Sequence, residues 1–143
     1  MELKLIKEKI SMFLSMLNEK EQKNFIELAQ IAMSVDGKID ESELQVMDVY
    51  RRETTLLDYE VQNKKESDLI TAFQASTKKV RKAVIIELAG VLDADETIES
   101  TEESWILNLG TEWGFRTSEI RRMVRWTQDF NDLLAEGYEI ILK

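Results

Sequence analysis

The sequence contains no cysteine and no histidine among its 143 residues. Without cysteine, the chain has no disulfides, no thiolate nucleophile and none of the usual zinc or iron–sulfur sites. Without histidine, it lacks the commonest general base and the commonest transition-metal ligand. Any metal must therefore be held by oxygen atoms, which favours calcium, magnesium or manganese. Because no nucleophile stands beside a base, we expect a non-enzymatic protein with no organic cofactor.

Proline is also absent, and there are only five glycines. Nothing therefore interrupts helices for long stretches, and no segment alternates apolar and polar residues at the period of a strand. We expect an all-α fold, a bundle of about seven helices forming a single domain over residues 1–143. The helices are expected over residues 3–17, 19–35, 41–52 and 78–92, around 69–73 and 105–113, and from 117 or 118 onwards.

The last of these helices has an apolar stripe that we expect to face the core. Its residues are Ile120, Met123, Val124, Thr127 and Leu134. Thr117 or Ser118 is expected to cap its start, and Gly114 to end the helix before it. The tail, residues 138–142, is apolar enough that we expect it to fold back on the body.

The chain has few basic residues relative to acidic ones, and its net charge is −9. An acidic protein does not offer the basic face that nucleic acid or an anionic membrane requires. The longest apolar runs are far shorter than a membrane span, and no signal segment opens the sequence. We expect a cytoplasmic protein that binds neither nucleic acid nor membrane.

Residues 34–43 read SVDGKIDESE and match the second half of a helix-loop-helix calcium loop. The matching residues are Asp36, Gly37, Ile39 and Glu43. The first half does not match, because Ala32 and Ser34 occupy places where the loop needs oxygen ligands. This segment alone therefore does not make a calcium site.

A second copy of the pattern, VLDADETIES, begins at residue 91. Its corresponding residues are Asp95, Ile98, Glu99 and Glu102. Asp93 adds a carboxylate, but Glu96 stands where the loop needs glycine. Each copy lies between two expected helices, so the chain divides into two pseudo-repeated helix-DG-helix halves, about residues 19–52 and 78–114.

These two junctions, AMSVDGKIDESEL and VLDADETIESTEE, resemble the tellurite-resistance TerB-like family. That family includes the helical N-terminal domain of some membrane-anchored co-chaperones of the DnaJ type. The resemblance spans about residues 24–134. It implies an all-helical fold with two equivalent halves, an acidic cluster proposed to bind metal, and a link to bacterial stress response, but no activity toward tellurite. Its acidic positions here are Asp36, Asp40, Glu43, Asp95, Glu99 and Glu102.

If the two junctions face each other, these carboxylates and Asp93 could together supply the six to eight oxygens that calcium prefers. The alternative needs no ion. Asp40 and Glu43 form a capping-box pattern, and acidic residues in a first helical turn bind free amide groups and favour the helix dipole. The sequence leaves both interpretations open.

A second candidate site is a basic and aromatic patch for a protein partner. Trp126 lies off the apolar stripe of the last helix, whereas Trp105 and Trp113 fit a core stripe. Arg121, Arg122 and Arg125 surround Trp126 in the sequence. The basic start of the helix over residues 78–92 is a further candidate partner surface.

Two functions follow as hypotheses. The first is a TerB-like protein with an acidic divalent-cation site and a stress-related role. The alternative is a protein-interaction module that binds its partner without a metal.

Overall fold

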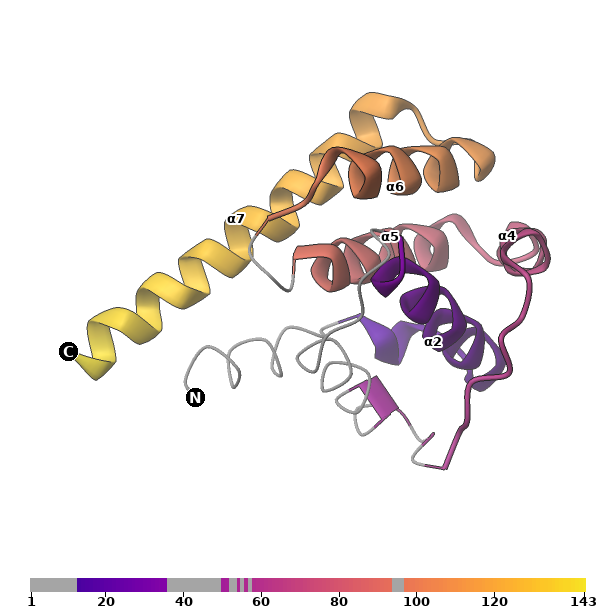
Figure 1. The fold of residues 1–143 in the computed structure, drawn as a ribbon, viewed down its shortest axis with the longest axis horizontal. Coiled ribbons are helices and arrows are strands. Elements are labelled where there is room, and N and C mark those ends of the chain that lie inside the picture. The colour runs from indigo at the N-terminus through magenta and orange to yellow at the C-terminus, as the bar shows by residue number, and fades with distance from the viewer. Residues whose placement is uncertain (1–12, 36–49, 52–53, 55, 57, 94–96) are drawn as a thin grey trace.

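The computed structural model describes residues 13–35, 50–51, 54, 56, 58–93 and 97–143 (Figure 1). The helices in this part of the chain are a short 3-10 helix, η1 (Leu14–Met16), and the α-helices α2 (Glu19–Met33), α4 (Glu66–Gln74), α5 (Lys78–Leu92), α6 (Ser100–Glu112) and α7 (Thr117–Leu142). The described residues contain no strand, so the all-α class is confirmed. Most of the helix expected over residues 41–52, and most of that over 3–17, lies outside the described residues.

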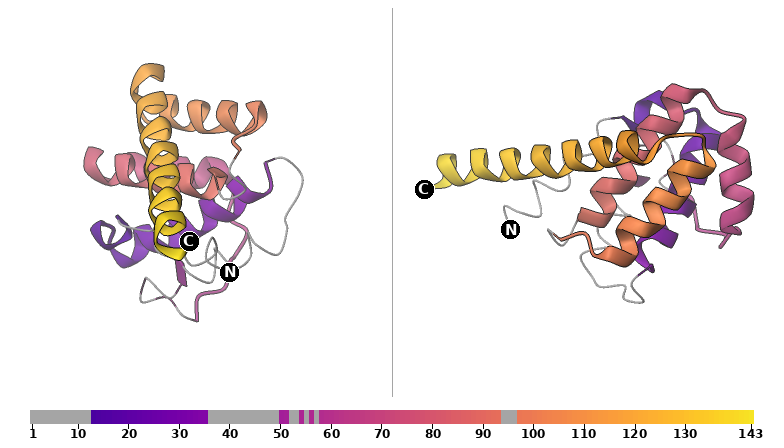
Figure 2. Two further views of the ribbon diagram at one scale, coloured as in Figure 1. Left: turned by 90° about the vertical axis from the view of Figure 1, so that its left-hand side faces the viewer. Right: turned by 90° about the horizontal axis from the view of Figure 1, so that it is seen from above.

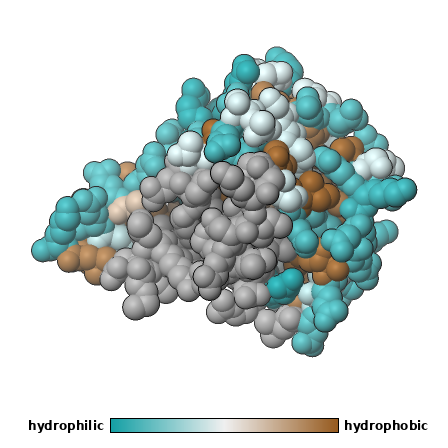
Figure 3. All heavy atoms as spheres, viewed as in Figure 1, coloured by the Kyte–Doolittle hydropathy of each residue, from teal (hydrophilic) through white to brown (hydrophobic). Residues whose placement is uncertain are grey.

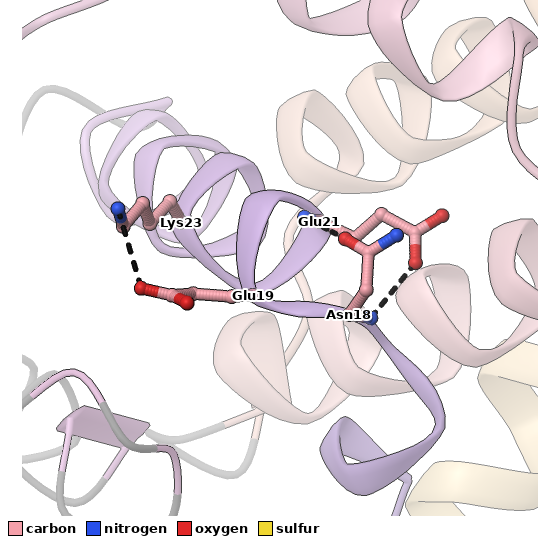
Figure 4. A network of polar contacts seen from close by, with 4 residues as sticks. All are labelled: Asn18, Glu19, Glu21 and Lys23. Atoms are coloured by element: carbon pink, nitrogen blue, oxygen red, sulfur yellow. Dashed lines mark hydrogen bonds and ion pairs between the residues drawn. The ribbon is translucent and has the colours of Figure 1, made fainter.

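Helix α2 begins where the sequence predicts a break, at Asn18. The Asn18 side chain accepts a hydrogen bond from the Glu21 backbone N–H at 2.8 Å, and the Asn18 N–H donates to Glu21 Oε1 at 2.9 Å (Figure 4). Glu19 also forms an exposed ion pair with Lys23, with 3.5 Å between Oε1 and Nζ. The reciprocal bonds satisfy two amide groups that a helix start otherwise leaves free, which fixes the first residue of α2.

Helix α5 lies at the centre of the fold and has the bounds that the sequence predicts. Figure 1 shows it between α2 on one side and α6 with α7 on the other, and it also packs against η1. Val84, Ile85 and Leu88 are fully buried. A helix with apolar residues around most of its circumference can only sit inside the bundle, which is why its period and bounds are clear in the sequence.

Helices α6 and α7 pack closely through Gly110. A β-carbon at Gly110 would lie 2.4 Å from Ile120 Cδ1, so only glycine allows this approach. Gly114 ends the α6 region with a φ of +87°, as the sequence predicts. The Trp113 ring contacts Phe73 at 5.4 Å between centroids and its Nε1–H donates to the Ile70 carbonyl at 3.0 Å, which ties α6 to α4.

The predicted cap of α7 was wrong. Neither Thr117 nor Ser118 caps the helix; the N-cap residue is Arg116, whose backbone N–H donates to Glu119 Oε1 at 3.1 Å. A carboxylate three residues further on reaches back to the free amide, so no hydroxyl cap is needed. The backbone hydrogen bond from Arg116 lowers the pKa of Glu119, and the charges of Lys78, Arg116 and Lys82 lower it further.

The predicted fold-back of residues 138–142 was also wrong. They continue α7, which spans 26 residues, about 39 Å at 1.5 Å per residue, and projects beyond the other helices (Figures 1 and 2). Ile120, Val124 and Thr127 in its first half are buried, but Ile140 and Ile141 are 71% and 78% exposed. An uninterrupted helix that packs at one end carries its other end away from the body. The core stripe is therefore only partly confirmed, because Met123 and Leu134 are half-buried.

A buried carboxylate fixes the non-helical stretch before α4. Glu27 on α2 is 2% exposed and accepts hydrogen bonds from the Tyr59 hydroxyl at 2.5 Å and from the backbone N–H groups of Gln62 and Lys64 at 2.7 and 3.0 Å. Burial raises the pKa of Glu27, but these hydrogen bonds outweigh burial and lower it overall. Burial and the adjacent carboxylate raise the pKa of Tyr59.

Within the described residues, no helix is both long enough and apolar enough to span a membrane.

Candidate functional site

The second acidic junction contains two buried carboxylates that hold helix ends in place. Asp93, at the end of α5, is 7% exposed and accepts a hydrogen bond from Asn131 Nδ2 on α7 at 2.8 Å. Glu102, in the first turn of α6, is 6% exposed and its Oε1 accepts from the Glu99 backbone N–H at 2.9 Å. The Glu102 bond is the capping role that an acidic residue near a helix start performs without an ion, whereas the Asp93 bond ties the end of α5 to α7.

The predicted cation site stays a prediction. Four of its seven residues, Asp36, Asp40, Glu43 and Asp95, lie outside the described residues. Within the described ranges, no three acidic side chains are grouped so that they could hold a metal ion. The structure therefore places Asp93, Glu99 and Glu102 at the ends of α5 and α6, and it does not test whether the two junctions face each other.

The predicted partner patch lies beside an open apolar groove between α5 and α7. The groove has a volume of about 350 Å³. Its lining residues are Phe13, Lys82, Ile86, Glu119, Arg122, Met123 and Trp126. It continues into a smaller hollow along α7 that reaches Phe130 and Asn131. Three separate segments thus build it: the residue before η1, the middle of α5 and the first half of α7.

An aromatic row forms one wall of the groove. The centroid of the Trp126 ring lies 6.2 Å from the ring centroid of Phe13 and 5.5 Å from that of Phe130. The Trp126 and Phe130 rings meet edge to face. Phe13 is itself anchored, because its backbone N–H donates to Glu87 Oε1 on α5 at 2.9 Å. Such edge-to-face contacts hold aromatic rings in defined positions. The wall is therefore preformed.

Trp126 differs from the other two tryptophans in its exposure. Trp113 is 5% exposed, which confirms its predicted place in the core, and Trp105 is half-buried with its Nε1–H donating to Glu66 Oε1 at 2.7 Å. Trp126 is 45% exposed, as expected for a residue off the core stripe. An exposed tryptophan at the edge of an apolar hollow is typical of a protein contact surface.

The three arginines of the predicted patch have different surroundings. Arg122 lines the groove, and Lys82 of α5 adds a second positive charge there. Arg121 instead points to α6, where it forms an ion pair with Glu103 at 3.6 Å, and Arg125 is exposed on α7. The structure thus brings Arg122 and Trp126 together in one site and places Arg121 on another face.

Sequence reasoning missed Phe13, Lys82 and Ile86 as parts of this site. Phe13 falls within the helix expected over residues 3–17, and no motif in the sequence singles out Ile86. The basic start of α5 was the one available signal, since it was noted as a candidate partner surface and Lys82 belongs to it. No sequence pattern links these residues to Trp126, because they meet only through the packing of α5 against α7.

Comparisons of the chain with protein-family models, with curated proteins and with solved structures each found no match. The resemblance to the TerB-like family therefore stays an expectation drawn from the two junctions.

Proposed function

We propose that this chain is a non-catalytic protein-interaction module whose groove between α5 and α7 binds an amphipathic helix of a protein partner, without a metal ion. The observation that carries the proposal is the half-exposed Trp126 beside an apolar hollow with Arg122 at its rim. Tryptophan and arginine are the residues most enriched at the energetic centres of protein interfaces. Here they share one site and are held by neighbouring elements.

The chemistry of the groove indicates what its partner carries. The aromatic and aliphatic wall of Phe13, Ile86, Met123 and Trp126 suits the apolar side chains that a helix presents at every third or fourth residue. Lys82 and Arg122 stand at the rim with Glu119 as the one acidic lining residue, so the rim is net positive. A partner helix with carboxylates beside its apolar stripe fits this rim.

The proposal is tested by capturing partners from a lysate of the source cells with the full chain, in the presence and absence of a chelator. Trp126→Ala and Arg122→Glu remove the anchor and reverse a rim charge, whereas Arg121→Glu is the matched control on the face toward α6. The captured protein is then purified and its affinity is measured against each variant. We expect Trp126→Ala and Arg122→Glu to weaken binding by about 30-fold or more, with the control and the chelator having little effect. Binding that survives both groove variants would overturn the proposal.

The cation site remains the second candidate function, and the stress-related role implied by the resemblance belongs to it. The supporting observation is that two carboxylates of the second junction, Asp93 and Glu102, lie buried at neighbouring helix ends. Calcium, magnesium and manganese are titrated while tryptophan fluorescence and melting temperature are followed, and the titration is repeated with Asp36→Asn and Glu102→Gln. Binding tighter than about 1 mM that both variants weaken would support the site, and weaker binding would leave only the capping role.

A further inference from the structure

The second half of α7 continues the groove wall as an exposed apolar seam. Its residues are Met123, Trp126, Phe130, Leu133, Gly137 and Ile140, separated alternately by three and four positions. This period of 3.5 residues is the one that allows two helices to pack along each other. Leu133 and Ile140 are 70% and 71% exposed, and the tip of α7 shows apolar surface at the left of Figure 3. The seam therefore has the spacing of a helix–helix contact and no such contact along most of its length within the described chain.

The charges beside the seam differ between the two halves of α7. In the first half, Arg122 and Arg125 are balanced by Glu119 and Asp129. In the second half, Asp132, Glu136 and Glu139 outnumber Lys143, so this half is acidic. A parallel second copy would place the two acidic halves together, whereas an antiparallel copy places each acidic half beside the balanced half, to which α5 adds Lys82. The charge pattern favours the antiparallel arrangement.

The apolar seam is self-complementary in the same orientation. In an antiparallel pair the outermost layers match Met123 with Ile140 of the second copy, and the central layers match Phe130 with Leu133. The layer between them places the large Trp126 ring against Gly137. A β-carbon at Gly137 would have no atom within 4 Å, so this position offers open space on the surface of α7. The largest side chain of the seam thus meets the smallest.

The same register brings the tip of the second copy to the groove. Ile140 beside Met123 carries the exposed residue Ile141 toward the hollow formed by Phe13 and Ile86. Glu136 flanks the seam on that tip, and the groove supplies Lys82 and Arg122 as positive charges that can pair with it. The acidic amphipathic helix that the groove requires is therefore present in this chain itself.

We propose that the occupant of the groove is the second half of α7 from a second copy of this chain, giving an antiparallel homodimer. This inference rests on the proposed function, because it names the partner helix of the same groove. Each copy supplies one groove and one helix tip, so the two contacts are equivalent and the assembly closes as a dimer.

The first test is the mass of the full chain by sedimentation equilibrium across the micromolar range. We expect a concentration-dependent rise from the monomer mass of 16.7 kDa to twice that value. Leu133→Glu and Ile140→Glu change exposed residues, so the monomer should still fold, and each should raise the dimer dissociation constant by about tenfold or more. Leu142→Glu, on the face of α7 away from the seam, is the matched control and should have a much smaller effect.

Gly137→Leu separates a specific seam from general stickiness. It makes α7 more apolar and more helix-favouring, but it fills the place that Trp126 of the second copy occupies. We expect this variant to raise the dimer dissociation constant by about tenfold or more. Stronger association of this variant would overturn the proposed register.

The orientation can be tested by cross-linking, because the chain has no cysteine of its own. Chains carrying Met123→Cys and Ile140→Cys should form a disulfide with each other when mixed under oxidising conditions. Neither should pair with itself, because like positions at the ends of an antiparallel pair lie about 25 Å apart, far beyond disulfide reach. Self-pairing of the Ile140→Cys chain, as in a parallel dimer, would overturn the proposal.

A chain that stays monomeric at all concentrations and forms no mixed disulfide would also overturn it. If deleting residues 1–12 then produced dimers, those residues and not a second copy would be the occupant of the groove. Neither result would decide the proposed function, since capture of a different protein that depends on Trp126 and Arg122 would still support it. If instead the captured protein binds equally well without Trp126 and Arg122, both the proposed function and the proposed dimer would be overturned.

Discussion

The two halves of α7 belong to one helix, and each carries apolar residues at helical spacing, but these residues have opposite surroundings. In the first half, Ile120 is fully buried and packs against α6 at Gly110, while Val124 and Thr127 face the core. In the second half, Leu133 and Ile140 are mostly exposed. The comparison teaches that an amphipathic pattern shows that a helix has a face to bury, but not which molecule buries it. The first half meets its own chain, and we propose that the second half meets another.

The largest expected effect compares one apolar residue from each half. Ile120→Ala should lower the free energy of unfolding by about 2–5 kcal/mol, because it leaves a cavity in a fully packed site. Leu133→Ala should change it by only about 0.5 kcal/mol. Both are measured by urea unfolding at low protein concentration, where we expect the chain to be monomeric. Equal losses would mean that the second half also packs on the body.

A charged residue of the body can be compared with one near the tip in the same way. Glu27→Gln should destabilise the protein by about 1–3 kcal/mol at neutral pH, because Glu27 is buried and accepts three hydrogen bonds. Glu139→Gln loses only an exposed ion pair with Lys143 and should have almost no effect.

The pH dependence of the Glu27 variant provides a check on the cause. Because folding lowers the pKa of Glu27 below its ordinary value of 4.5, its stabilisation is complete above about pH 4.5 and is lost as the pH falls through the lowered value. The difference between wild type and Glu27→Gln should therefore shrink in acid. A difference independent of pH would show that lost packing, and not the charge, explains the effect.

The last comparison is between two glycines, one facing each environment. Gly110→Ala should destabilise by about 1–3 kcal/mol, since its β-carbon would overlap Ile120. Gly137→Ala should stabilise the monomer by about 0.5–1 kcal/mol, because the added β-carbon meets nothing and alanine favours a helix. Opposite changes in the melting temperature of the two variants would support this contrast, and a lower melting temperature for both would contradict it.

The parts of the fold that sequence predicted are those decided by local chemistry. The break at Asn18, the stop at Gly114 and the bounds of α5 depend on residues within one or two turns, and all three were correct. The exposure of Trp126 was also predicted, because it departs from a clear core stripe.

The parts that sequence could not predict depend on distant neighbours. Nothing local distinguishes Arg121, which meets Glu103 of α6, from Arg122, which lines the groove. Glu27 reads as an ordinary polar residue of α2 until its partners around residue 60 are known. The tail of α7 was expected to fold back because an apolar surface needs cover, and its own chain was wrongly assumed to provide it.

Hydrogen exchange along α7, measured residue by residue on dilute and concentrated protein, tests the central claim most directly. The account predicts that amides of the first half are protected at every concentration because they belong to the packed body. Amides of the second half should exchange rapidly in dilute protein and become protected as the concentration rises. Equal protection of the two halves in dilute protein would contradict it, and so would a second half that stays unprotected at every concentration.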